Sequence, residues 1–121
     1  MKKILILEDE LIISDLLAKK LSSEGYFVKT AQNGKDGMDL MLQEIPDLVL
    51  TDVIMPQKDG FTVIEEMKQN QALKSVPIII ISNSGQPVEI DRAKELGVSD
   101  LIIKTEFNLN EIIAKVKSKI G

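Results

Sequence analysis

Short apolar runs alternate five times with amphipathic segments, and this alternation constrains the fold more than any other feature of the sequence. Most of these runs are apolar at consecutive positions and rich in β-favouring residues, as expected of strands that are covered on both faces, whereas 26–31 contains Lys29 and Thr30. The expected strands are residues 4–7, 26–31, 48–52, 78–81 and 101–103. Because strands and helices alternate strictly, the sequence predicts a parallel sheet with helices on both faces.

The segments that follow the strands are expected to be helices, because their apolar residues recur at spacings of three and four. The first two helices place on their apolar faces Ile13, Leu16, Leu17 and Leu21, and then Met38, Met41, Leu42 and Ile45. The other three place there Val63, Ile64 and Met67, then Ile90, Ala93 and Leu96, and finally Leu109, Ile112, Ile113, Val116 and Ile120. Met38 and Met41 are interpreted as core residues rather than as parts of a binding site.

Residues that favour helix ends set the boundaries of these helices. The start signals are Asn33 with Asp36, Pro87, and Asn108 with Glu111, and the stop signals are Gly25, Pro46 and Gly97. Asparagine followed three residues later by an acidic residue resembles a capping box, and glycine adopts the left-handed conformation common at helix C-termini. The polar segment 68–75 is expected to be a surface loop.

We expect one α/β domain that spans residues 1–121, since a chain of this length can bury a core without disulfides. Right-handed crossovers leave few topologies for five strand–helix units. The common solution is a doubly wound, five-stranded parallel sheet with strand order 2-1-3-4-5, the (βα)5 flavodoxin-like arrangement. A ligand crevice is then expected between the first and third strands, where the winding reverses.

The absence of cysteine and histidine from the sequence excludes several kinds of chemistry. Disulfides, thiolate metal sites and cysteine nucleophiles cannot occur, and neither can a Ser-His-Asp hydrolase or imidazole acid–base catalysis. Any chemistry must therefore use carboxylates, hydroxyls, lysine or a hard metal ion.

The charge pattern argues against direct nucleic-acid binding, because the net charge is −4 and the fifteen basic residues are scattered along the chain. No apolar run is long enough to span a bilayer, and residues 1–4 do not resemble a signal peptide. We therefore expect a cytoplasmic protein without membrane insertion.

Four of the five expected strands are followed by polar residues that could act together. These are Glu8 and Asp9 after the first strand, Asp52 at the end of the third, Ser82 after the fourth and Lys104 after the fifth. Because all these ends meet at one edge of a parallel sheet, we expect the side chains to converge there. Three neighbouring carboxylates repel one another unless a cation lies among them, and Mg²⁺ prefers oxygen ligands and commonly shares its site with phosphate.

This convergence predicts phosphoryl transfer onto an aspartate. Asp52 would attack a phosphoryl group and form an acyl phosphate, while Glu8 and Asp9 hold the metal directly or through water. Ser82 could donate a hydrogen bond to a phosphoryl oxygen, and Lys104 could neutralise its charge.

Each of these residues taken alone also fits a purely structural role. Asp52 could cap the turn that follows its strand, and Glu8-Asp9-Glu10 could supply an N-cap and first-turn acids to the first helix. Ser82 could be a loop hydroxyl, and Lys104 could be a solvated strand end. The joint placement of these residues is what favours the functional interpretation.

The chain as a whole resembles the receiver domains of two-component response regulators, and the resemblance extends over its full length. The residues that carry it are Glu8-Asp9, Asp52 followed by Met55-Pro56 and Asp59-Gly60, Ser82, and Lys104. The resemblance implies that Asp52 is the phosphoacceptor. It also implies a Mg²⁺ ion bound by Asp9, Asp52 and the backbone carbonyl of Ile54, with Glu8 acting mostly through water.

The resemblance further implies roles for residues around the phosphoryl group. Val53, Ser82, Asn83 and Lys104 would contact that group, and the catalytic set would be Asp52 with Ser82 and Lys104. Ser82 and the residue at position 101, here Leu101, would form the switch. Such a domain catalyses its own phosphorylation and dephosphorylation but turns over no external substrate.

Partners are also implied by the resemblance. The phosphoryl donor would be a phosphohistidine on a sensor histidine kinase or a histidine phosphotransfer protein, docking near the first helix. Phosphorylation would change the face formed by the fourth helix, fifth strand and fifth helix, and so alter the affinity for an output partner that the sequence does not identify. The chain would be either a single-domain regulator or a part of a longer protein.

The sequence departs from this family at three positions. Leu101 stands where an aromatic switch residue is usual, and Thr105 follows the lysine in place of a proline with a cis bond. A cis bond before a residue other than proline costs roughly 3 kcal/mol. Asn83 replaces a small residue after the switch hydroxyl, and we hypothesise that it alters water access to the acyl phosphate and hence its lifetime.

Two other functions compete with this interpretation. A pseudo-receiver would keep the fold as a protein-binding scaffold without phosphorylation, which Leu101 and Thr105 favour and the acidic residues and Lys104 oppose. A flavin-binding protein of the same fold is the second, but the chain has no tryptophan and one tyrosine to stack on a flavin.

Overall fold

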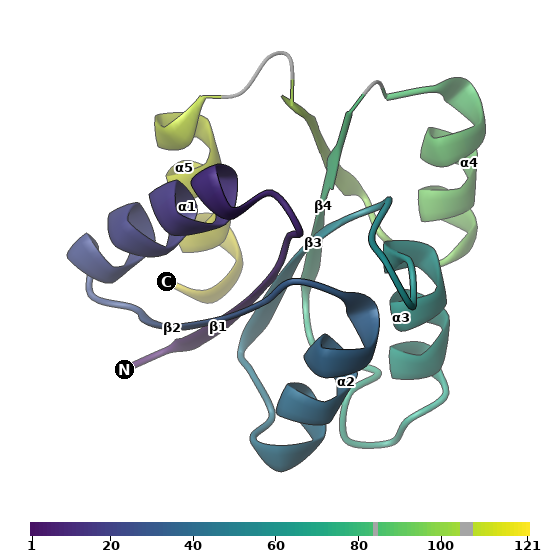
Figure 1. The fold of residues 1–121 in the computed structure, drawn as a ribbon, viewed down its shortest axis with the longest axis horizontal. Coiled ribbons are helices and arrows are strands. Elements are labelled where there is room, and N and C mark those ends of the chain that lie inside the picture. Colours follow the sequence, from purple (N-terminus) through teal and green to yellow (C-terminus); the bar gives the residue numbers. More distant parts are fainter. Residues whose placement is uncertain (84, 105–107) are drawn as a thin grey trace.

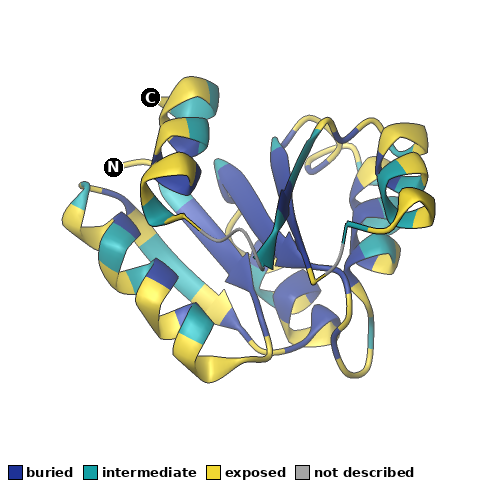
Figure 2. Ribbon diagram, turned by 90° about the horizontal axis from the view of Figure 1, so that it is seen from above, coloured by how far each residue is buried: buried dark blue, intermediate teal, exposed yellow. Residues whose placement is uncertain are grey.

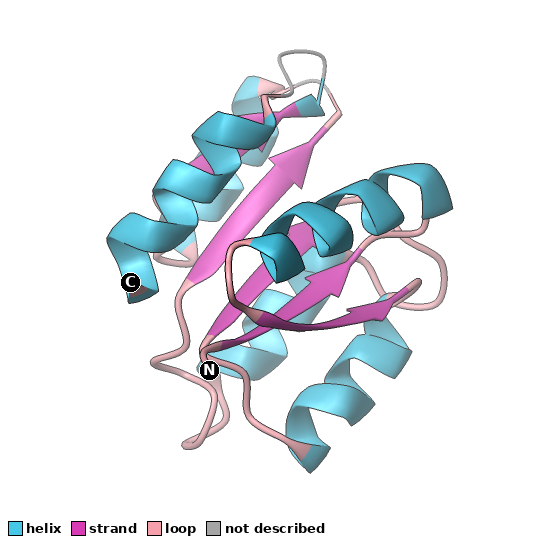
Figure 3. Ribbon diagram, turned by 90° about the vertical axis from the view of Figure 1, so that its left-hand side faces the viewer, coloured by secondary structure: helices cyan, strands magenta, loops and turns pink. Residues whose placement is uncertain are grey.

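The computed structural model describes residues 1–83, 85–104 and 108–121, and within them the chain forms five parallel strands and five helices (Figure 1). The strands are β1 (Lys3–Leu7), β2 (Phe27–Ala31), β3 (Leu48–Asp52), β4 (Ile78–Ser82) and β5 (Asp100–Ile103). They pair in the order β2-β1-β3-β4-β5, and their arrows point in one direction in Figure 3. The α/β fold and the strand order predicted from the sequence are therefore confirmed.

Helices cover both faces of the sheet, as doubly wound topology requires. They are α1 (Leu11–Ser23), α2 (Gly34–Gln43), α3 (Gly60–Lys68), α4 (Pro87–Glu95) and α5 (Leu109–Ile120). Figure 1 shows α1 and α5 together on one face and α2, α3 and α4 on the other. In the described part of the chain, none of the helices has the length and apolar character needed to cross a membrane.

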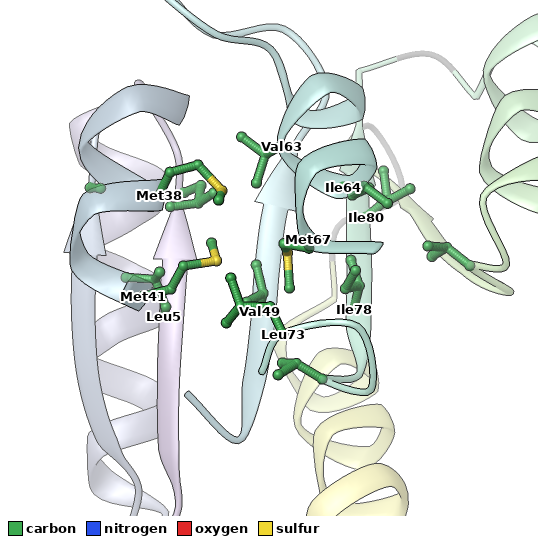
Figure 4. Close-up of a cluster of buried hydrophobic side chains, with 14 of the residues drawn as sticks. Leu5, Met38, Met41, Val49, Val63, Ile64, Met67, Leu73, Ile78 and Ile80 are labelled. Atoms are coloured by element: carbon green, nitrogen blue, oxygen red, sulfur yellow. The ribbon is translucent and has the colours of Figure 1, made fainter. Parts of the chain in front are cut away.

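Two hydrophobic clusters fill the spaces between the sheet and its helices, and Figure 2 shows buried central strands between helices whose outer surfaces are exposed. The run Ile78–Ile81 shows why consecutive apolar residues are needed, because alternate side chains of a strand point to opposite faces. Ile78 and Ile80 pack in the cluster under α2, α3 and α4, and Ile79 and Ile81 pack in the cluster under α1 and α5. Met38 and Met41 lie in the first cluster and face α3 (Figure 4), which confirms them as core residues.

The predicted helix caps form as the sequence indicates. Asn33 Oδ1 accepts a hydrogen bond of 2.8 Å from the Asp36 N–H, and Asn33 Nδ2 donates back to the Asp36 carboxylate at 3.0 Å. Asn108 Oδ1 accepts from the Glu111 N–H at 3.2 Å at the start of α5. Gly25 follows α1 with φ of +96°, a conformation that L side chains rarely adopt.

Three residues predicted to face the core are exposed instead: Leu16, Leu42 and Ile45. The helical period gives the direction of the apolar face, but how wide a stripe is covered depends on the neighbouring elements. Leu16 and Leu42 lie beyond the covered stripe of their helices, and α2 ends at Gln43, before Ile45.

The segment 68–75 is only partly the surface loop that its polarity predicts. Leu73 is buried in the cluster with α3. Asn70 Oδ1 accepts hydrogen bonds from the N–H groups of Ala72 and Leu73, and this turn directs Leu73 back toward the core.

Candidate functional site

The ends of β1 and β3 bring two carboxylates side by side at the edge of the sheet. These strands are adjacent, and their register pairs Leu7 with Thr51, so Glu8 and Asp52 follow at equivalent positions. Both residues are buried, with 1% of Glu8 and 2% of Asp52 exposed. The carboxylates therefore lie at the edge of the sheet between β1 and β3, where the winding reverses.

Lys104 brings its ammonium group into this pair of carboxylates from the end of β5. Its Nζ atom lies 2.8 Å from Asp52 Oδ2, 2.8 Å from Glu8 Oε1 and 2.6 Å from Glu10 Oε2. Because β4 separates β3 from β5, the long lysine side chain must reach past the end of β4 to make these contacts. We call Glu8, Glu10, Asp52 and Lys104 the charge cluster.

Both carboxylate oxygens of Asp52 are held by hydrogen-bond donors. Oδ1 accepts from the N–H of Val53 at 2.7 Å, and Oδ2 accepts from Lys104 Nζ at 2.8 Å. Thr51 Oγ1 donates to the carbonyl of Asp52 at 2.9 Å. The first bond is local, as in a capped turn, but the second joins residues 52 positions apart and fixes the carboxylate inside the cluster.

The loop between β3 and α3 folds tightly around the end of β3. The Gly60 N–H donates to the Val53 carbonyl at 2.8 Å, and a Cβ atom on Gly60 would lie 2.0 Å from the carbonyl oxygen of Asp52. Only glycine permits this approach without displacing the backbone. Asp59 then begins α3 by accepting a hydrogen bond of 2.8 Å from the Thr62 N–H. The Asp-Gly pair in the sequence thus positions the loop that contains Val53 and the exposed Ile54.

Glu10 is the site residue that the sequence interpretation did not select. It occupies the N-cap position of α1, yet within the described residues its side chain makes no capping hydrogen bond and instead accepts one from Lys104. Its backbone N–H donates to Glu8 Oε2 at 3.3 Å. The Glu10 side chain therefore does not cap α1, in contrast to the structural role that the sequence also allowed for these acids.

Asp9 does not join the charge cluster. The three carboxylates within 4.8 Å of one another belong to Glu8, Glu10 and Asp52, whereas Asp9 is exposed. Glu10 is in an extended conformation, and alternate residues of an extended chain point to the same side. This alternation could have identified Glu10 from the sequence, because residues 8 and 10 of an extended chain point to the same side. The role of Asp9 as a metal ligand stays a prediction.

Burial and the neighbouring charges shift the pKa values of Glu8 and Lys104 upward. Burial raises the pKa of Glu8 to about 7, and the Asp52 carboxylate adds to this rise while the Lys104 ammonium opposes it. Burial lowers the pKa of Lys104, but its contacts with Asp52, Glu10 and Glu8 raise it by more, so the pKa of this lysine lies above its usual range. The ammonium of Lys104 therefore stays charged, and Glu8 holds a proton more readily than an exposed carboxylate does.

The charge cluster fits a hard divalent cation. Its three carboxylates outnumber its one ammonium, and all of the potential ligand atoms are oxygens. Glu8 Oε1 is buried and, among the described residues, has no hydrogen-bond partner, although Lys104 Nζ lies 2.8 Å away. A buried carboxylate oxygen with unused lone pairs is a suitable ligand for an ion such as Mg²⁺.

The remaining predicted site residues belong to β4, the loop after it and β5. Ser82 is fully buried at the end of β4, and its Oγ atom hydrogen bonds to Glu89 of α4 and to the N–H of Gly85. Asn83 is exposed, and Leu101 is half-buried against the cluster under α2, α3 and α4. The isomer of the Lys104–Thr105 bond falls outside the described residues.

Comparisons with known proteins agree on one family. The family model described as "Response regulator receiver domain" matches residues 4–117. "Probable transcriptional regulator ycf27" of Guillardia theta is 36% identical over 117 residues, which is 97% of this chain and 44% of that protein. The chain thus spans less than half of the length of this relative.

Solved structures show the same fold. The signal receiver domain of a signal transduction histidine kinase from Syntrophus aciditrophicus superposes with a TM-score of 0.91 and 28% identity, over 99% of this chain and 90% of that one. The BeF3-activated N-terminal receiver domain of Klebsiella pneumoniae RstA gives a TM-score of 0.88 and 26% identity, over 98% of each chain.

Proposed function

The chain belongs to the response regulator receiver domain family, and from this premise we propose that it accepts a phosphoryl group on Asp52 from a phosphohistidine donor. The observation that carries the proposal is the contact of 2.8 Å between Asp52 Oδ2 and the ammonium of Lys104, beside the buried carboxylate of Glu8. This arrangement provides a nucleophile next to a fixed positive charge. It suits the transfer of an anionic group, which depends on positioning and charge compensation.

In the proposed reaction a carboxylate oxygen of Asp52 attacks the phosphorus atom of the phosphohistidine. The new O–P bond forms as the P–N bond breaks, and the electron pair of that bond leaves with the imidazole nitrogen. The product is an acyl phosphate on Asp52 and a free histidine on the donor. Lys104 holds its positive charge within hydrogen-bond distance of the attacking group, so it can balance the charge of the phosphoryl oxygens.

The carboxylates of Glu8, Glu10 and Asp52 would hold the divalent ion. When bound, Mg²⁺ would neutralise the carboxylates and the phosphoryl oxygens and so favour the approach of two anionic groups. Family resemblance adds Asp9 and the carbonyl of Ile54 to this set. The two alternatives for a metal ligand, Asp9 or Glu10, predict different effects of Asp9→Asn and Glu10→Gln on the affinity for Mg²⁺.

The proposed donor is a sensor histidine kinase or a histidine phosphotransfer protein. Next to the site, α1 exposes the apolar side chains of Leu11, Ile12 and Leu16, with Ile12 85% exposed. Ile54, in the loop directly after Asp52, is 63% exposed. Exposed apolar residues near a reactive group are typical of protein-binding surfaces, and α1 begins directly after Glu10 of the charge cluster.

We propose that phosphorylation then changes the face formed by α4, β5 and α5, with Ser82 as the sensor of the phosphoryl group. Such a change requires that the phosphoryl group binds more tightly to one of two pre-existing states. Asn83, exposed next to Ser82, would influence water access to the acyl phosphate. Equal rates of autodephosphorylation in the wild type and Asn83→Ala would contradict this role for Asn83.

Binding of beryllofluoride in the presence of Mg²⁺ tests the proposed function directly. The wild type should show changes in amide NMR shifts around Asp52, and Asp52→Asn should show none, because the fluoride complex needs the carboxylate oxygen. Asp91→Asn is a matched control on the exposed side of α4 and should respond like the wild type. A wild type that does not respond would contradict the proposal.

The pseudo-receiver is the second candidate, and the aliphatic Leu101 at the switch position favours it. Such a scaffold would keep the fold without regulation by phosphorylation. The buried carboxylates and Lys104 oppose this interpretation, because a scaffold has no need of them. A Mg²⁺ titration separates the two candidates, since only the phosphoacceptor is expected to bind the ion at the charge cluster.

A further inference from the structure

The hydroxyl of Ser82 makes two hydrogen bonds at the end of β4. Its Oγ atom donates to Glu89 Oε1 in the first turn of α4 and accepts from the N–H of Gly85 at 3.0 Å. Ser82 has no exposed surface. Because a serine hydroxyl carries one proton, this proton cannot serve Glu89 and a phosphoryl oxygen at the same time.

Glu89 connects this hydroxyl to a helix that has few other attachments. Figure 1 shows α4 at the outer end of its layer, and Ala93 is its one buried residue in the described part of the chain. The N-cap residue Gln86 makes no capping hydrogen bond with its side chain within the described residues. Arg92 forms an ion pair with Glu65 of α3 nearer the other end of the helix. The Ser82–Glu89 hydrogen bond is therefore a polar contact that ties the first turn of α4 to the sheet.

We propose that Glu89 is a positioning residue that couples the occupation of Asp52 to α4 by competing for the proton of Ser82. This inference rests on the proposed function. When Ser82 donates to a phosphoryl oxygen, Glu89 loses its donor, and a half-buried carboxylate without a donor is unfavourable. Movement of the first turn of α4 returns this carboxylate to water. The exchange of one hydrogen-bond partner thus changes the position of the helix.

Competition predicts that removing Glu89 strengthens binding at Asp52. A hydrogen bond to a charged group contributes more net free energy than one between neutral groups, so Glu89→Ala should tighten beryllofluoride binding by about tenfold to a hundredfold at saturating Mg²⁺. Glu89→Gln keeps an acceptor oxygen without the charge and should give a smaller gain. If Glu89→Ala does not fold, the binding test is made with Glu89→Gln. Glu95→Ala, on the exposed side of the same helix, should bind like the wild type.

A double-mutant cycle with Ser82 distinguishes competition from a merely structural role of Glu89. The dissociation constant for beryllofluoride is measured by calorimetry for the wild type, Glu89→Ala, Ser82→Ala and the double variant. We expect Glu89→Ala to tighten binding when Ser82 is present and to have no effect when Ser82 is replaced. A change of the same size in both backgrounds, or no change in either, would overturn the inference.

Amide hydrogen exchange gives a readout of α4 itself. The N–H groups of Glu89 and Ile90 donate to the Gln86 carbonyl at 2.9 and 3.0 Å. Beryllofluoride should speed the exchange of these two amides in the wild type, whereas Glu89→Ala should exchange fast without it. If the wild type binds beryllofluoride but the cycle is additive, the inference fails and the proposed function stands. If the wild type does not bind it at all, both fail.

Discussion

Replacing Lys104 with methionine should destabilise the protein and make its stability depend on Mg²⁺. The change removes the ammonium and keeps a side chain of similar length, so three carboxylates remain within 4.8 Å of one another without a compensating charge. The side chains of Lys104, Asp52 and Glu8 are only 9%, 3% and 2% exposed, so water screens their charges poorly. Removing one partner of a buried ion pair typically costs about 3 to 5 kcal/mol. Protonation of Glu8 relieves part of the repulsion, and we therefore expect a loss of about 3 kcal/mol at pH 8.

Urea unfolding in EDTA and in excess Mg²⁺, at pH 8 and at pH 6, measures this effect. The deficit of Lys104→Met should be largest in EDTA at pH 8, and it should shrink when Mg²⁺ supplies positive charge or when acid protonates Glu8. Lys117→Met is a matched control, because its ion pair with Glu24 lies on the surface and its loss should have little effect. A Lys104→Met protein that is as stable as the wild type in EDTA at pH 8, or that gains nothing from Mg²⁺, would refute this account of the charge cluster.

Three further predictions follow from the geometry of the site. Burial raises the pKa of Glu8 from 4.5 to about 7. Between these two pH values the folded state therefore binds more protons than the unfolded chain. The stability that this proton contributes is present below pH 4.5 and is lost as the pH rises through 7. In urea unfolding with EDTA, Glu8→Gln should remove this part of the pH dependence of the unfolding free energy. If the unfolding free energy of Glu8→Gln changes with pH as steeply as that of the wild type, the prediction is wrong. Glu10→Gln should weaken Mg²⁺ binding more than Asp9→Asn if the charge cluster holds the ion, and calorimetry showing the reverse order would assign the metal to Asp9. Gly60→Ala places a Cβ atom 2.0 Å from the Asp52 carbonyl oxygen and should cost about 2 to 3 kcal/mol in thermal unfolding, whereas wild-type stability would mean that the loop relaxes freely.

The central strands β1, β3 and β4 follow directly from the sequence because they are covered on both faces. In Ile78–Ile81, two isoleucines pack into each of the two clusters, so a continuous apolar run is required and is easily recognised. The convergence of Glu8, Asp52 and Lys104 follows from the parallel sheet, since the ends of the strands meet at one edge.

Contacts that depend on the path of a loop are not readable from the sequence. The side of the chain to which Asp9 and Glu10 point is set by the backbone between β1 and α1, and it places Glu10 rather than Asp9 in the charge cluster. The hydrogen bond between Ser82 and Glu89 joins residues seven positions apart, and no helical or strand period predicts it. The exposure of Leu16 depends on how far neighbouring elements extend over α1.

Chemical mapping of the phosphorylated residue tests the central claim most directly. The protein is incubated with acetyl phosphate and Mg²⁺, the acyl phosphate is trapped by reduction with borohydride, and peptides are analysed by mass spectrometry. We predict a single modified residue, Asp52, whose labelling disappears when EDTA removes the metal. Labelling at another residue, or an unmodified Asp52 under conditions that keep the protein folded, would contradict the account.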